Sequence, residues 1–187
     1  MPPRELLLDP EIASMEKGLT RRLHHAIEVL SPLFVAKPNK DFPRFEVDNK
    51  LIGTSYNPAL NRVRTSRYGF PIPDSEIGEE AGHYLHFGVN PLFGKYSDQE
   101  GLLLRQLIEC VGRFSGLVYA EFFGEDINPT KDLQDDLKQT HEIPYILAER
   151  LFARHGSSFL FQLSRMKSQE FRELLNNTGG QNGFSSN

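Results

Sequence analysis

The residues with the clearest chemical potential are two acids and a histidine in one short stretch, Glu79-Glu80-Ala81-Gly82-His83. On a helix, positions 79 and 83 lie only about 40° apart, so both side chains can point at one ion. Carboxylate oxygen and imidazole nitrogen bind Zn²⁺ at similar distances of about 2.0–2.2 Å. Glu80 is a carboxylate of the kind that serves as a general base. The spacing therefore permits a metal site at Glu79 and His83 with Glu80 beside it.

The same residues are also compatible with roles that involve no metal ion. Two glutamates early in a helix are typical of solvated acids that interact favourably with the helix dipole. His83 could be a hydrogen-bonded core histidine, although it shares a face with Glu79, which a dry core would not tolerate unpaired. His86, three residues after His83, could be a fourth ligand, a group that orients a ligand, or a histidine favoured at a helix C-terminus. The sequence leaves these alternatives open.

A third candidate ligand is Glu109, which lies in a long apolar segment next to Ile108 and Val111. A glutamate that is buried among such residues needs a strong partner. Arg105 and Arg113, four residues before and after it, could supply that partner as an ordinary intrahelical ion pair. A metal ion could supply it equally well.

Three features of this region belong together. They are a predicted strand pair (residues 53–58 and 62–64), the pattern E-x-G-H-x-L-H from Glu80 to His86, and Glu109, 26 residues after His83. Together they resemble the gluzincin type of zincin metallopeptidase over residues 50–123. The resemblance implies that His83 and Glu109 are metal ligands, that Glu80 is the general base, and that the ion is Zn²⁺.

The chain departs from that family at Glu79, which stands where the H-E-x-x-H motif has its first histidine. Two carboxylates and one imidazole would neutralise a divalent ion, whereas two imidazoles and one carboxylate leave a formal charge of +1. A neutral centre is a weaker Lewis acid, and oxygen-rich ligation favours harder ions such as Mn²⁺ or Fe²⁺. If the resemblance holds, the carboxylates of Glu79 and Glu109 and the imidazole of His83 should converge beside the small sheet, with Glu109 within about 8 Å of His83.

These observations give three hypotheses for function. The first is a zincin-like, metal-dependent hydrolase, specifically a peptidase that acts on a peptide or protein substrate. The second is an inactive protein of the same fold that serves as a binding module for a peptide or protein. The third is a helical protein with a carboxylate-bridged di-metal site, which needs a second E-x-x-H unit. No glutamate precedes the remaining histidines by three residues, which argues against the third hypothesis (His24, His25, His141, His155).

The pattern of apolar residues predicts one mostly helical α+β domain over residues 1–176. We expect an N-terminal helix at 11–30, ended by Ser31-Pro32, and a small antiparallel sheet within 44–66. The metal-site helix should span 74–86, with Asp74 or Ser75 as its N-cap. The central core helix should span 98–123, followed by C-terminal helices within 130–176, at 130–140, 144–154 and 158–176. A disordered tail is expected at 177–187 because it is rich in Gly, Asn and Ser.

Composition narrows the class of protein. The chain has 187 residues, of which 39% are hydrophobic and 25% charged, as in ordinary globular proteins. Its net charge of −4 gives no reason to expect nucleic acid or an anionic membrane as a partner. The single cysteine, Cys110, excludes an internal disulfide and is expected in the core. No signal peptide and no apolar run of about 18 residues is present, so we expect a cytoplasmic protein.

Overall fold

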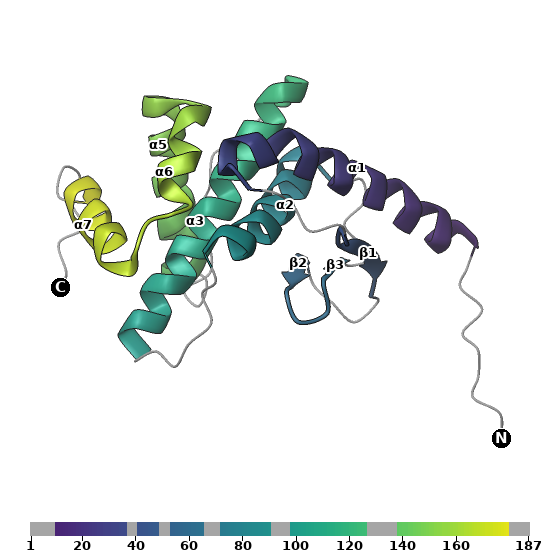
Figure 1. The fold of residues 1–187 in the computed structure, drawn as a ribbon, viewed down its shortest axis with the longest axis horizontal. Helices are drawn as coiled ribbons and strands as arrows, with labels where there is room; N and C mark the ends of the chain where they lie inside the picture. The colour runs from purple at the N-terminus through teal and green to yellow at the C-terminus, as the bar shows by residue number, and fades with distance from the viewer. Residues whose placement is uncertain are drawn as a thin grey trace.

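The computed structural model describes residues 10–36, 41–48, 53–65, 72–90, 98–126 and 138–179. Within these ranges the chain is mostly helical with one small three-stranded sheet, which confirms the predicted α+β class. In Figure 1, the N-terminal helix crosses α2 and runs above the sheet, while α5, α6 and α7 lie on the other side of α3. The candidate site lies between α2, α3, β2 and the start of α5.

The longer helices are α1 (Pro10–Phe34), α2 (Asp74–Val89), α3 (Asp98–Phe123), α5 (Ile143–His155) and α7 (Ser168–Gly179). Shorter turns are the π-helical η1 (Lys138–Glu142), the 3₁₀ turn η2 (Ser157–Phe159) and α6 (Leu160–Leu163). The boundaries of α3 are those predicted, and α5 differs from its predicted range by one residue at each end. Cys110 is fully buried in α3, as expected. No helix within the described residues is long and apolar enough to cross a membrane.

The predicted end of α1 at Ser31-Pro32 is wrong, because the helix continues to Phe34. Pro32 has no N–H group that could donate a hydrogen bond to the carbonyl oxygen of Glu28. The hydroxyl of Ser31 lies 3.4 Å from that carbonyl oxygen and also donates to the carbonyl oxygen of Ile27. Phe34 is fully buried, so the extra turn places an aromatic ring in the core. This burial favours continuation of the helix through the proline.

The sheet has the order β1-β3-β2, with β1 at Arg44–Val47, β2 at Thr54–Asn57 and β3 at Arg62–Thr65. The hairpin of β2 and β3 is antiparallel, as predicted, and the Asn57 side chain accepts hydrogen bonds from the turn. The prediction of a wholly antiparallel sheet is wrong, because β1 pairs with β3 in parallel. Strand β3 takes the central position because Val63, paired with Phe45, is fully buried there.

The ends of α2 also differ from the prediction. Pro73 is the N-cap, so neither Asp74 nor Ser75 caps the helix through its side chain. Asp74 instead forms a 2.6 Å ion pair with Arg22, and the Ser75 N–H donates to Glu125 Oε2 at 2.9 Å. The carboxylate that satisfies this helix start therefore comes from a distant part of the chain, which local sequence cannot indicate.

The C-terminal region is more broken than expected. In place of one helix at 158–176, the chain forms η2, α6 and α7, and the bend between α6 and α7 allows Leu160, Leu163 and Phe171 all to be fully buried. Residues 177–179 continue α7, so the disordered tail cannot begin at 177. The remainder of that predicted tail, and most of the predicted helix at 130–140, lie outside the described residues.

Helices α2 and α3 pack closely through residues with small or no side chains. A Cβ atom added at Gly78 would lie 2.6 Å from the Tyr119 Cβ. One added at Gly82 or Gly116 would lie closer than 3.0 Å to atoms of the facing helix. Such distances leave no room for a methyl group, so the glycines set the separation of the two helices.

We expect Gly116→Ala to destabilise the protein by about 1–3 kcal/mol, because the new methyl group would overlap the carbonyl oxygen of Ser75. The matched control is Gly101→Ala in the same helix, where nothing lies within 4 Å of the added Cβ. That control should gain up to about 1 kcal/mol from helix propensity. Urea unfolding followed by circular dichroism measures both. Equal effects of the two changes would contradict the packing described here.

Candidate metal centre

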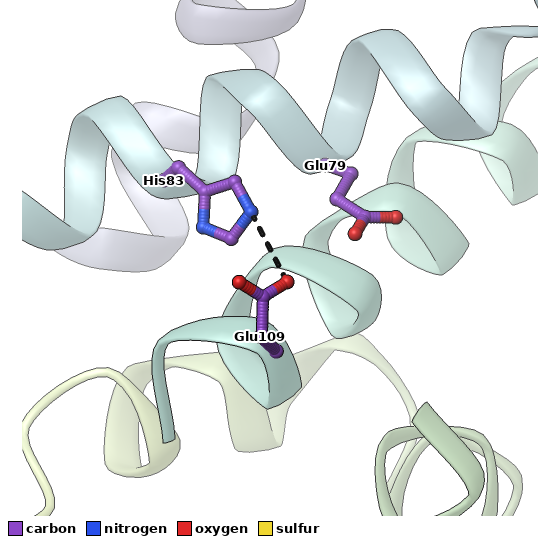
Figure 2. Close-up of side chains that lie close together, drawn as sticks. All are labelled: Glu79, His83 and Glu109. Carbon is purple, nitrogen blue, oxygen red and sulfur yellow. Dashed lines mark ion pairs between the residues drawn. The ribbon is translucent and has the colours of Figure 1, made fainter. Parts of the chain in front are cut away.

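The three predicted ligands come together in the structure. Glu79 and His83 lie one turn apart on α2, and Glu109 faces them from α3 (Figure 2). One ligand atom from each residue lies within 4.8 Å of the other two. The His83 Nε2 is 3.8 Å from Glu109 Oε2, well inside the limit set from the sequence. The predicted convergence is confirmed, and this group could hold a metal ion.

Helix packing explains why His83 meets Glu109. Gly112 lies one turn after Glu109, and a Cβ at that position would lie closer than 3.0 Å to the ring of His83. The imidazole therefore rests on the bare backbone of α3, at the level of the Glu109 side chain. Any other residue at position 112 would push the ring away from the acid.

Burial decides between the alternatives for the acids on α2. Glu79 is 8% exposed and Glu80 is 4% exposed, so the interpretation as solvated acids is wrong.

Arg113, one of the two predicted partners of Glu109, forms an ion pair with Glu149 of α5 at 2.6 Å. His86 is fully buried, and within the described residues it belongs neither to the converging ligand group nor to the lining of the adjacent cavity.

A cavity of about 310 Å³ opens beside the three ligands. Strand β2 at the sheet edge, α2, α3, η1 and α5 all contribute to its wall (Thr54, Ser55, Tyr56, Pro58, Glu79, Glu80, His83, Phe87, Ile108, Glu109, His141, Tyr145). Glu80 faces this cavity as predicted for a base, and its Oε2 has no hydrogen-bond partner within the described residues. A backbone hydrogen bond from Tyr56 connects Glu80 to the sheet.

Two residues of this site were missed from the sequence. The Tyr145 hydroxyl donates a hydrogen bond to Glu79 Oε1, and the His141 Nε2 lies 3.8 Å from Glu109 Oε2. The available signal was their spacing, because residues 141 and 145 are four positions apart and can share one helical face, on either side of Pro144. Nothing in the sequence indicated that this face would meet α2 and α3.

Burial shifts every acid–base group of the site toward its neutral form. Burial raises the pKa of Glu79 to about 7, opposed by the Tyr145 hydrogen bond and Arg113. Burial and then Glu79 raise the pKa of Glu109 to about 8, and burial raises the pKa of Glu80 well above its usual range. Burial and then His141 lower the pKa of His83 to about 4.

The donor set fits a divalent cation. Two buried carboxyl groups, the partly buried carboxyl group of Glu109 and a neutral imidazole supply oxygen and nitrogen atoms that can bind a cation. The unpartnered Glu80 Oε2 and the space that Gly112 leaves for His83 are consistent with this fit. Clusters of strongly shifted groups in a cavity are typical of functional sites.

No protein-family model matches this chain, and no curated protein or solved structure matches it either. The likeness to gluzincins therefore continues to rest on the residues that carry it.

Stability of the metal-free protein should fall as the pH rises from 7 to about 8.5. In the unfolded chain these carboxyl groups ionise near 4.5, whereas the folded protein keeps the protons of Glu79 and Glu109 up to about pH 7 and 8. In this pH range the folded state binds more protons than the unfolded chain does. Its stability therefore decreases as the pH rises. His83 hardly contributes in this window, because its imidazole is neutral in the folded state and nearly so in the unfolded chain.

Urea unfolding of chelator-treated protein at several pH values measures this trend. Glu109→Gln should flatten it, while Glu121→Gln, an exposed position on the same helix, should not. A stability that stays constant over this range would show that the carboxyl groups are already ionised in the folded, metal-free protein.

Proposed function

We propose that this chain binds one divalent metal ion through Glu79, His83 and Glu109. The observation that carries the proposal is the convergence of their ligand atoms within 4.8 Å across two helices. A bound cation would compensate the carboxylates of Glu79 and Glu109, whose pKa values burial raises to about 7 and about 8. Zn²⁺ is the ion favoured by the family resemblance, and the two carboxylates also suit Mn²⁺ or Fe²⁺.

We further propose that the metal-bound protein hydrolyses peptide bonds in the adjacent cavity. When bound, a divalent ion at this position supplies Lewis-acid chemistry. With its carboxyl group ionised beside the bound cation, Glu80 would accept a proton from a water molecule as the water oxygen attacks the carbonyl carbon of the peptide. Glu80 would then deliver that proton to the amide nitrogen as the C–N bond breaks.

The cavity wall supports a peptide as the substrate. Strand β2 is at the edge of the sheet and contributes Thr54, Ser55 and Tyr56 to the wall. An extended peptide can add to such an edge through main-chain hydrogen bonds, and its side chains then alternate between the cavity and solvent. This arrangement would bring a peptide carbonyl close to Glu80, whose position is tied to the same strand.

Metal binding without catalysis is the second candidate function. The observation that favours it is the charge of the site, because Glu79, Glu80 and Glu109 together exceed the charge of a divalent ion. A centre with no net positive charge activates water poorly. In that case the cavity would serve to bind a peptide or protein partner.

Purified protein should bind about one divalent ion per chain. His83→Ala and Glu109→Gln should each weaken the affinity by more than about 100-fold, because each removes a ligand rather than an orienting partner. Glu121→Gln is the matched control on α3 and should bind like the wild type. Isothermal titration with Zn²⁺, Mn²⁺ and Fe²⁺ measures the affinities, and mass spectrometry of metals measures the content. Absence of binding to all three ions would refute the proposed metal site.

Glu80→Gln separates catalysis from binding. It should lower the hydrolysis of fluorescently labelled casein by about 100-fold or more, because the amide cannot accept the proton, while metal content stays near that of the wild type. Glu121→Gln again serves as the control. If wild-type protein binds the ion and cleaves nothing, the hydrolase proposal fails and the non-catalytic candidate stands. If Glu80→Gln cleaves as fast as the wild type, Glu80 is not the base.

A further inference from the structure

His141 lies on the wall of the same cavity, beside Glu109, although it is not one of the three residues whose ligand atoms all lie within 4.8 Å of one another. It lies in the π-helical turn η1, outside the stretch that resembles the metallopeptidase motif. Its Nε2 is 3.8 Å from Glu109 Oε2, and the His83 Nε2 is 3.8 Å from the same oxygen atom. One carboxylate oxygen therefore has an imidazole nitrogen near it from each of two separate helical segments.

These distances are informative about what lies between the atoms. A direct N–H···O hydrogen bond would measure about 2.7–3.2 Å, so neither imidazole is hydrogen-bonded to this oxygen. Two atoms that share one ion can lie up to about 4.2 Å apart, twice a metal–ligand bond of about 2.1 Å. Both nitrogens thus have a separation from Glu109 Oε2 that suits a shared cation better than a hydrogen bond.

The other ring nitrogen of His141 is already engaged. The His141 Nδ1 lies 2.8 Å from the hydroxyl oxygen of Thr140. When Nδ1–H donates to this hydroxyl, Nε2 carries the free lone pair and can bind a cation. A metal-binding histidine typically has such a partner on its second nitrogen, because that bond fixes the tautomer and the ring orientation.

The segment that carries His141 is fixed relative to the other ligands. Tyr145, four residues later, shares its helical face and donates to Glu79, while the two rings meet edge-on with centroids 6.0 Å apart. One face of η1 and α5 therefore positions the Tyr145 hydroxyl to donate to Glu79 and the His141 ring to lie beside Glu109. A π-helical turn of this kind is frequent at functional sites.

We propose that His141 is a further ligand of the ion, so that the site contains two imidazoles and two carboxylates. This inference rests on the proposed metal binding. His141 would supply the second imidazole that Glu79 fails to provide, from a different helix of the fold. Glu79, His83, Glu109 and His141 would together supply four protein ligands to the ion.

X-ray absorption spectroscopy of the Zn²⁺-loaded full chain counts the imidazole ligands directly. We expect two in the wild type and one in His141→Phe, which keeps a ring of similar size beside Tyr145. Titration should show an affinity lower by about 100-fold or more, beyond the loss typical of an orienting partner. The matched control is His155→Phe, at an exposed position on α5 that stacks on Phe159, and it should retain both imidazoles and full affinity.

The outcomes separate this inference from the proposed function. If the wild type binds no Zn²⁺, the metal site itself fails. If it binds Zn²⁺ with one imidazole, or if His141→Phe keeps the wild-type imidazole count, His141 is not a ligand while the metal site stands. A loss of 10- to 100-fold in affinity at an unchanged count would make His141 a positioning residue for Glu109 and would overturn the inference. If His141→Phe does not fold, His141→Gln replaces it. The number of imidazole ligands in the wild type and in that variant then decides whether His141 is a ligand.

Discussion

The close approach of α2 to α3 is the constraint on which the rest of the structure depends. Gly78 and Gly82 of α2 face the small residues of α3, and Gly112 leaves space for the ring of His83. Helices with larger residues at their contact pack about 8–10 Å apart, and the smaller residues bring these two backbones closer together. The separation fixes the distance from His83 to Glu109, so the geometry of the candidate site follows from residues that carry no chemistry.

The buried acids conflict with the stability of the same helices. Glu79, Glu80 and Glu109 lie among core residues, where each ionised carboxylate has lost hydration that the unfolded chain would provide. Apolar residues at these three positions would serve the packing of α2 and α3 better. A sequence that buries two acids and partly buries a third at one place is typical of a functional site. The cation proposed here would offset this unfavourable burial of the acids.

The sequence alone predicted the helices and strands that have strong local patterns. It also predicted the candidate metal ligands that lie on those elements. The periodic apolar pattern predicted α3, the spacing of Glu79 and His83 placed both on one face of α2, and Glu109 stood out as an acid in an apolar segment. The parallel pairing of β1, the cap of α2 by Glu125 and the position of His141 were not predictable. Each depends on a contact between segments far apart in the chain, which local spacing does not encode.

The electrostatic effect of Glu79 on a bound ion depends on the neighbours of its carboxylate. A free carboxylate would neutralise more of the charge of a bound ion than an imidazole does. Glu79, however, accepts a hydrogen bond from Tyr145, and Arg113 stabilises its negative charge from nearby. Both interactions draw electron density away from the carboxylate and make it a weaker donor toward a cation. The second imidazole proposed at His141 would act in the same direction, because it adds a ligand without adding charge. The chemistry of this site is thus set by the pairing of α2 with η1 and α5, and the motif helix alone does not determine it.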